Sequence, residues 1–148
     1  MVLKRISWHH PAFNYRYDGV VYAVFVSLGF AALENVGYLY AFGVSVLLPR
    51  ALLAVPAHMG LSVFMGAYYG RAKVCCSRGD KQGCVRSLWI SYLLAVFLHG
   101  FYDACVMLQS TLSNWVFFFF VFIMYDAVIR RIRREASNDR EIPQRPIY

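Results

Sequence analysis

Five polar residues stand within long apolar stretches of the sequence: Glu34, Asn35, His58, His99 and Asp103. An acidic group at the centre of a membrane helix costs about 3 kcal/mol, so such groups usually face a cavity or one another and carry function. His99 and Asp103 are four residues apart and share one helix face, either as two ligands of one ion or as an imidazole with its orienting carboxylate. These residue types suit general acid–base chemistry or the binding of a divalent metal ion.

The elements that must carry these residues are four apolar segments, each close to the ~20 residues that a helix needs to cross a bilayer. Their approximate positions are 20–43, 50–70, 88–109 and 113–129. We expect an all-α fold, a multipass transmembrane helical bundle of about four spans. Residues 1–134 should form this membrane domain, and the polar, proline-containing residues 135–148 a solvated cytoplasmic tail.

Composition and charge support this fold and predict its orientation. The 148 residues are 59% hydrophobic and 16% charged, which excludes a disordered chain or a large ectodomain and argues against a soluble globule. The net charge of +7 comes from basic residues beside alternate spans, so we assign it to membrane orientation and predict no nucleic-acid partner. A multipass protein of the cell membrane is expected, with both termini and the 71–87 loop cytoplasmic and outward turns near 44–49 and 110–113.

Antiparallel spans bring the ionisable residues to a similar depth in the lipid bilayer. Counting ~1.5 Å per residue from the cytoplasmic end of each span gives ~21 Å for Glu34, ~18 Å for His58, ~17 Å for His99 and ~22 Å for Asp103. The four groups should therefore lie in one layer, slightly outside the midplane. A single membrane His or Asn often only joins helices by hydrogen bonds, and for His58 or Asn35 taken alone that interpretation stays open.

The cysteines have a simple interpretation. Cys75, Cys76 and Cys84 share one basic stretch, and Cys105 lies in an apolar run. The basic stretch is predicted to be cytoplasmic, and the spacing fits no strong zinc pattern. We therefore expect reduced thiols and no disulfide framework.

Other residues in the spans have structural interpretations. Gly66 and Gly70 are four residues apart and would allow close helix packing. Pro56 should kink the second span and free backbone groups near His58. Asp126 precedes Arg130 by one helical turn, which favours an ion pair at the membrane boundary.

Four separated motifs occur in order between about residues 17 and 103. They are DGVVY at 18–22, GFAALENVGY at 29–38, a stretch from Arg50 that ends in PAH at 56–58, and LHGFYD at 98–103. Together they resemble the PrsW family of intramembrane proteases, within the clan of CAAX prenyl endopeptidases and bacteriocin-processing enzymes. The resemblance implies a helical membrane endopeptidase whose substrate is a membrane protein or peptide. In the family, a membrane-bound anti-sigma factor is cut to release a stress-response sigma factor.

The resemblance also implies roles for individual residues. It makes Glu34, His58, His99 and Asp103 the catalytic set, and Asn35, Tyr38 and Arg50 residues that contact substrate or support that set. His99 and Asp103 would polarise the developing oxyanion, and His58 and Glu34 would position water or relay protons. The clan favours a metal-free site without a cofactor. Two histidines and two carboxylates at one depth also leave a zinc-like divalent ion open.

The sequence departs from the family at its first motif, a Glu-Glu followed shortly by a Lys. In the clan this glutamate is the favoured activator of the attacking water, and no Glu precedes Asp18 here. We therefore expect the chain to correspond to the C-terminal part of a family member. The competing interpretation is a non-catalytic membrane protein, either a remnant that binds partner helices or peptides or a proton-coupled carrier.

Overall fold

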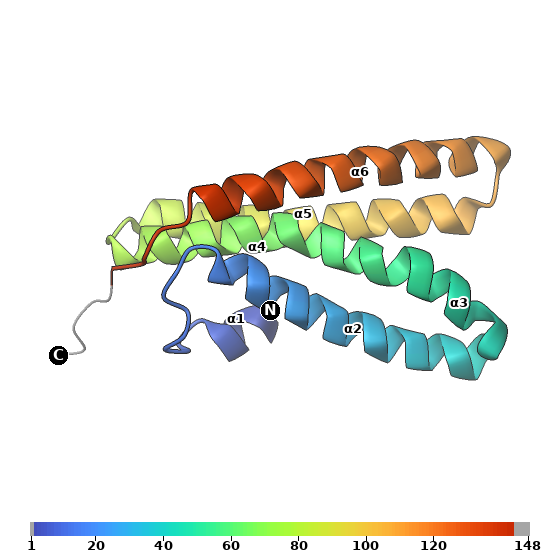
Figure 1. Ribbon diagram of the computed structural model, residues 1–148, viewed down its shortest axis with the longest axis horizontal. Coiled ribbons are helices and arrows are strands. Elements are labelled where there is room, and N and C mark those ends of the chain that lie inside the picture. Colours follow the sequence, from blue (N-terminus) through green and yellow to red (C-terminus); the bar gives the residue numbers. More distant parts are fainter. Residues whose placement is uncertain (1, 144–148) are drawn as a thin grey trace.

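The computed structural model describes residues 2–143, and the regular elements in that range are all helical (Figure 1). A short N-terminal helix precedes four long helical stretches, the second of which begins with short 3-10, α and π turns. In chain order the elements are α1 (Val2–Ser7), α2 (Asp18–Phe42), η1 (Val44–Val46), α3 (Leu47–Pro49), η2 (Arg50–Ala54), α4 (Val55–Ser77), α5 (Lys81–Leu108) and α6 (Thr111–Ser137).

Four helical stretches are long and apolar enough to span a bilayer, which confirms the predicted all-α multipass bundle. They are Asp18–Phe42, Val44–Ser77, Lys81–Leu108 and Thr111–Ser137. The second of these stretches differs most from the predicted span, 50–70. The turn predicted near 44–49 is wrong, because η1, α3 and η2 are helical and lead directly into α4. The chain instead reverses at Gly43, whose φ of 77° suits a residue without a side chain.

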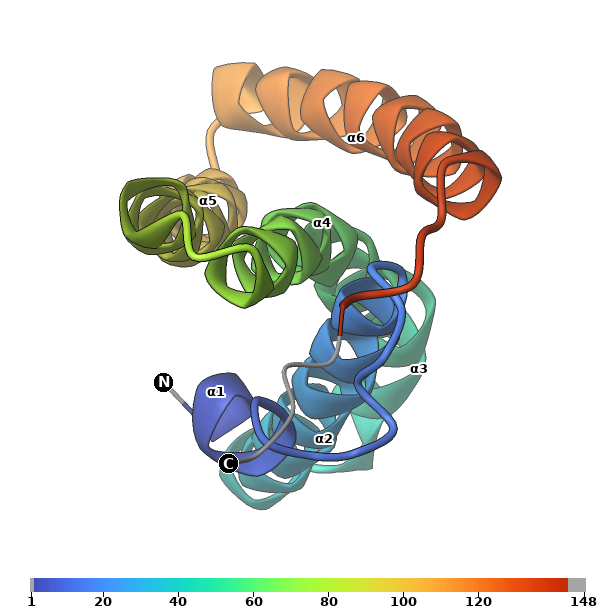
Figure 2. The ribbon, with the colours of Figure 1, turned by 90° about the vertical axis from the view of Figure 1, so that its left-hand side faces the viewer.

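α4 lies at the centre of the bundle, with α2 and α5 packed along it (Figure 2). α6 packs against α4 and α5. One buried apolar cluster joins α2, α4 and α6 through residues such as Val20, Leu61 and Met124. A second cluster joins α1, the loop after it, α2 and α4, with Tyr69 fully buried at its centre. This arrangement gives α4 a neighbour on each side, so residues of α2 and α5 can meet across it.

Small residues set the distance between α2 and α4. A Cβ added at Gly66 would lie 2.5 Å from the Cα of Val20 and 2.6 Å from the carbonyl oxygen of Gly19. A Cβ at Gly19 would lie 2.5 Å from the backbone nitrogen of Gly70. Such contacts are closer than real Cβ atoms allow, so the two backbones meet only because these positions are glycine. The close packing predicted for Gly66 and Gly70 is confirmed.

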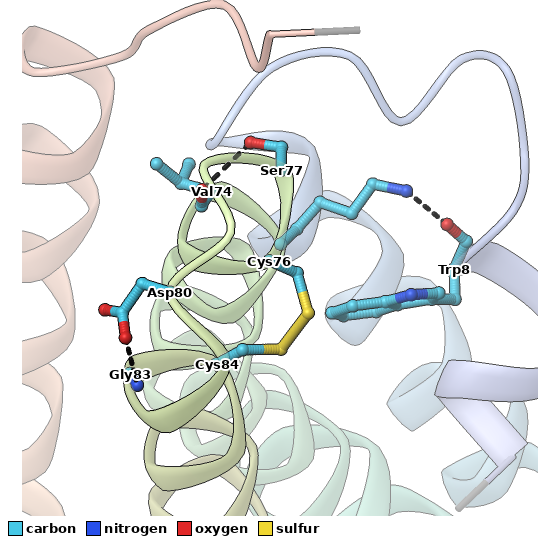
Figure 3. Close-up of a disulfide and its surroundings, with 8 residues drawn as sticks. Trp8, Val74, Cys76, Ser77, Asp80, Gly83 and Cys84 are labelled. Atoms are coloured by element: carbon cyan, nitrogen blue, oxygen red, sulfur yellow. Dashed lines mark hydrogen bonds between the residues drawn. A yellow bond between two sulfur atoms is a disulfide. The ribbon is translucent and has the colours of Figure 1, made fainter. Parts of the chain in front are cut away.

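A disulfide between Cys76 and Cys84 ties the end of α4 to the first turn of α5 (Figure 3). The chain reverses between the helices at Gly79, which has a φ of 84°. The side chain of Asp80 then caps α5 by accepting a hydrogen bond from the backbone N–H of Gly83 at 2.8 Å. This tight reversal leaves the Cα atoms of the two cysteines 5.1 Å apart, within the range of a disulfide.

The expectation of reduced thiols is therefore wrong for Cys76 and Cys84. The last turn of α4 and the first turn of α5 face each other across a short connection, and this proximity could not be inferred from the spacing of the cysteines. Cys75 and Cys105 are free thiols, as expected. The predicted pair of Asp126 and Arg130 is also present, as an exposed ion pair on α6.

The segment predicted as a solvated tail, 135–148, is partly packed. α6 continues to Ser137, and Glu135 is buried in ion pairs with Arg16 at 2.9 Å and Arg131 at 3.0 Å. Ile142 is buried in the N-terminal cluster, and its N–H donates to the carbonyl of Asn14 at 2.7 Å. The prediction is wrong for these residues because their partners lie near the other end of the sequence. Residues 144–148 lie outside the described residues.

Candidate metal centre

Three metal-ligating side chains converge from three helices: Glu34 of α2, His58 of α4 and His99 of α5. Each offers one ligand atom, and these atoms all lie within 4.8 Å of one another. Glu34 Oε2 and His58 Nε2 are 2.9 Å apart. The ring centroids of His58 and His99 are 4.9 Å apart. The structure thus brings together three of the four ionisable residues that the sequence placed in one membrane layer.

The fourth residue, Asp103, lies beside His99. Its Oδ2 is 3.2 Å from His99 Nε2, one helical turn further along α5. Asp103 does not belong to the group of three convergent ligand atoms. Of the two arrangements that the i, i+4 spacing allowed, the geometry therefore favours an imidazole with its orienting carboxylate.

Packing around the two imidazoles fixes where they point. Phe30 of α2 approaches both rings edge-on, with centroid distances of 5.7 Å to His58 and 6.2 Å to His99. The hydroxyl of Ser27, also on α2, donates to the carbonyl oxygen of His58 at 2.9 Å. His58 itself is buried. The α2 face that carries Glu34 therefore also holds the two histidines in position.

A π-helical segment that begins at Arg50 precedes His58. Arg50–Ala54 forms the π turn, and Pro56 follows within the first turn of α4. Proline has no N–H to donate to the preceding turn, so the regular helical hydrogen bonding cannot continue there. A kink was predicted at Pro56, and the structure has a wider π turn just before this residue. Such π turns are frequent at functional sites.

Arg50 joins the supporting residues that the sequence singled out into one unit. Its Nε donates to Asn35 Oδ1 at 2.6 Å, and one terminal nitrogen lies 3.3 Å from Glu34 Oε2. Its guanidinium stacks on the ring of Tyr38, 3.7 Å from the centroid. One arginine thus holds three residues of α2 from the start of the second span.

Charge compensation explains how Glu34 is accommodated within a membrane span. The side chains of Arg50 and Glu34 are 16% and 28% exposed, and the side chain of His58 is 7% exposed. A partly buried carboxylate is tolerated when it is paired and hydrogen-bonded, and here a guanidinium and an imidazole both contact the same oxygen. The guanidinium holds that oxygen beside the histidine.

A cavity of about 550 Å³ opens beside the cluster. Its walls come from α2, the start of the second span, α5 and α6, and include Glu34, Arg50, His58 and Asp103. Apolar side chains make up most of the remaining lining. The cavity is large enough for a few peptide side chains, and its ionisable lining residues come from α2, η2, α4 and α5.

Two polar residues at this cavity were missed by the sequence analysis, Tyr102 and Asn114. Tyr102 directly precedes Asp103 on α5. Asn114 lies in the first turn of α6, within an apolar span. Like Asn35, Asn114 is a polar amide among apolar residues, and the same criterion could have identified it.

The donor set fits a divalent metal ion of the zinc type. Two imidazoles and one carboxylate form a common set of protein ligands at catalytic zinc sites, where a fourth position stays open for water or substrate. Tetrahedral zinc at ~2.0–2.1 Å from each ligand keeps ligand atoms roughly 3.4 Å apart, so the observed spread of up to 4.8 Å needs only small side-chain movements. The carboxylate beside His99 supplies the outer support that metal-bound histidines usually have.

Comparisons with known proteins agree with the site. A family model described as PrsW family intramembrane metalloprotease matches residues 1–128. Protease PrsW of Geobacillus kaustophilus is 39% identical over 135 residues, which are 90% of this chain and 56% of the relative. Protease PrsW of Halalkalibacterium halodurans is 38% identical over 139 residues, 94% of this chain and 62% of the relative.

A third relative, Protease PrsW of Bacillus subtilis, is 39% identical over 124 residues, 84% of this chain and 54% of the relative. The chain thus spans a little over half the length of the curated relatives it matches. No solved structure shows a significant match. Because the matching family model covers residues 1–128, and with them every residue of the cluster, this chain belongs to the PrsW family of intramembrane metalloproteases.

Proposed function

We propose that the chain carries the metal-binding part of a membrane-embedded endopeptidase that hydrolyses peptide bonds of membrane-bound protein substrates. The observation that carries the proposal is the convergence of Glu34, His58 and His99 within 4.8 Å, inside predicted spans and beside a cavity. The curated relatives are longer, so the complete activity is proposed for the full-length context. A zinc-like ion is favoured over the metal-free alternative, because the family is described as metalloproteases and the donor set suits zinc.

Each residue of the cluster has a role in this proposal. A bound divalent ion would act as a Lewis acid and lower the pKa of its water. His58, His99 and Glu34 would hold the ion, His58 and His99 through neutral ring nitrogens. Asp103 would accept the Nε2–H of His99 and so fix the tautomer of that ring. Arg50 is a positioning residue that keeps the Glu34 carboxylate beside His58.

The proposed substrate is a single-span membrane protein, such as an anti-sigma factor, by the family resemblance. The cavity supports this class, because it lies among the membrane spans and its lining is mainly apolar. A substrate segment could therefore reach the ligand cluster without leaving the bilayer.

Cleavage of a single-span reporter by the full-length protein tests the proposal. His99→Ala and Glu34→Gln should each lower cleavage at least a hundredfold, because each removes a metal ligand. His9→Ala and Asp126→Asn are the matched controls: His9 is exposed near the N-terminus, and Asp126 is exposed on α6. A chelator should abolish cleavage, and zinc should restore it. Cleavage at the wild-type rate in both ligand variants would overturn the assignment.

A proton-coupled carrier is the second candidate. It is favoured by the unbroken series of ionisable contacts from Arg50 through Glu34 and His58 to His99 and Asp103. A carrier predicts pH-dependent uptake that is lost in Glu34→Gln and is insensitive to chelators. The protease predicts chelator sensitivity and no uptake.

We further propose that both termini and the connection between α4 and α5 face the cytoplasm, since basic residues cluster there. The disulfide in that connection is the observation against this orientation, because disulfides persist mainly in oxidising compartments. A reporter enzyme active only outside the cytoplasm should be inactive when fused after Lys81. Activity of that fusion would reverse the orientation.

A further inference from the structure

Two polar cavities lie at the end of the bundle opposite the turn at Gly43. One, of about 440 Å³, lies between α4 and α6 and reaches Arg16. The other, of about 700 Å³, lies between α4 and α5. Both are lined by Tyr68 and Arg71 of α4, so they meet along that helix. Figure 2 shows the near ends of α5 and α6 apart, with α4 between them, so each of the two cavities can lie against α4.

Arginine dominates the lining of these two cavities, which together we call the basic groove. The arginines that line it are Arg16, Arg71, Arg86, Arg131, Arg134 and Arg140. The acidic residues in the lining are Glu135 and Asp80. Glu135 pairs with Arg16 and Arg131, and Asp80 caps α5. Within residues 2–143 the remaining four arginines have no ion-pair partner.

Two of the arginines in the groove, Arg16 and Arg131, are held in fixed positions. Glu135 is buried and fixes Arg16 and Arg131 from one side. The guanidinium of Arg131 also lies over the ring of Tyr68, 5.2 Å from its centroid. The Nε of Arg16 is buried and has no hydrogen-bond partner within residues 2–143. Held cations and an excess of positive charge favour a bound anion.

We propose that the basic groove binds the phosphate group of an anionic phospholipid. Guanidinium groups match phosphate oxygens in paired hydrogen bonds, so several arginines around one cavity favour a phosphate ligand. The groove lies at the ends of membrane-spanning helices, where lipid headgroups are located, and basic pockets between such helices are typical headgroup sites. Ile90 of α5 adds an apolar side chain to the lining, and a lipid chain would continue from there. The site is separate from the Glu34–His58–His99 cluster.

The test compares lipid binding by the purified chain in mixed micelles and in neutral lipid nanodiscs. Phosphatidylglycerol or cardiolipin should stay bound in native mass spectrometry and should raise the unfolding temperature, whereas phosphatidylcholine should not. Arg71→Gln combined with Arg134→Gln should weaken binding about thirtyfold, a factor of about five per arginine. Both side chains are exposed, so the fold should persist, which circular dichroism checks.

The matched control combines Arg78→Gln with Arg133→Gln, two exposed arginines outside the groove. It removes the same charge and should leave binding within about twofold of the wild type. Equal losses in the two double variants would overturn the proposal, since attraction would then depend on net charge alone. Inorganic phosphate at matched concentration should not stabilise the protein. If inorganic phosphate raised the unfolding temperature as much as the anionic lipids do, the groove would bind free phosphate and the lipid proposal would be wrong.

Discussion

At the scale of single residues, Arg50 links the candidate centre to its surroundings. It contacts Asn35, Glu34 and the Tyr38 ring with three different parts of one guanidinium. The planar guanidinium group can donate hydrogen bonds from its edges and stack on an aromatic ring with its face, whereas the ammonium group of lysine cannot make both kinds of contact. The orientation of Glu34 toward His58 therefore depends on arginine at this position.

The corresponding variant is Arg50→Lys. It keeps the charge but loses the contact to Asn35 and the stacking on Tyr38, so zinc affinity should fall by about 10–100-fold, as for other outer supports of metal ligands. Competition with a chromophoric chelator measures this affinity. Arg133→Lys, on the exposed part of α6, is the control and should bind zinc like the wild type. Unchanged affinity in Arg50→Lys, with an unchanged unfolding temperature, would show that Arg50 does not position Glu34.

The sequence predicted that Glu34, His58 and His99 lie at one depth, and the structure brings them together, but the contacts of Arg50 could not be predicted. Glu34, His58 and His99 were recognisable because ionisable groups in apolar spans are costly and helical counting gives their depth. Which way Arg50 points depends on the π turn at Arg50–Ala54, which rotates the residues before it relative to those after it. Apolar periodicity does not reveal a π turn.

At the scale of elements, the centre depends on how closely α2 approaches α4. Gly19 meets Gly66 and Gly70 backbone to backbone. Glu34 lies on the same helix as Gly19, and His58 on the same helix as Gly66. A change in the spacing of these helices would therefore also move Glu34 relative to His58.

Gly66→Ala tests this dependence. Its Cβ would meet the backbone of α2, so the free energy of unfolding should fall by about 1–3 kcal/mol, the usual cost of overpacking. Gly37→Ala is the matched control, because nothing lies within 4 Å of its added Cβ and alanine favours a helix more than glycine. Denaturant titration in mixed micelles measures both. Equal stability of the two variants would contradict the close packing.

At the scale of the whole molecule, the sequence predicted the four spans well and the ends of the chain poorly. The spans follow from local hydropathy, so the apolar segments along the sequence are sufficient to find them. Glu135 and Ile142 are buried against residues more than a hundred positions earlier, and the disulfide of Cys76 and Cys84 depends on a tight helix reversal. Contacts between distant segments leave no periodic signal in a single sequence.

Zinc binding by the purified chain tests the central claim most directly. After dialysis against trace zinc in detergent micelles, elemental analysis should find one zinc ion per wild-type chain. His58→Ala and His99→Ala should lose the ion, while His9→Ala should keep it. If the wild-type chain binds no zinc, or both histidine variants bind it as tightly as the wild type, Glu34, His58 and His99 do not form a metal centre.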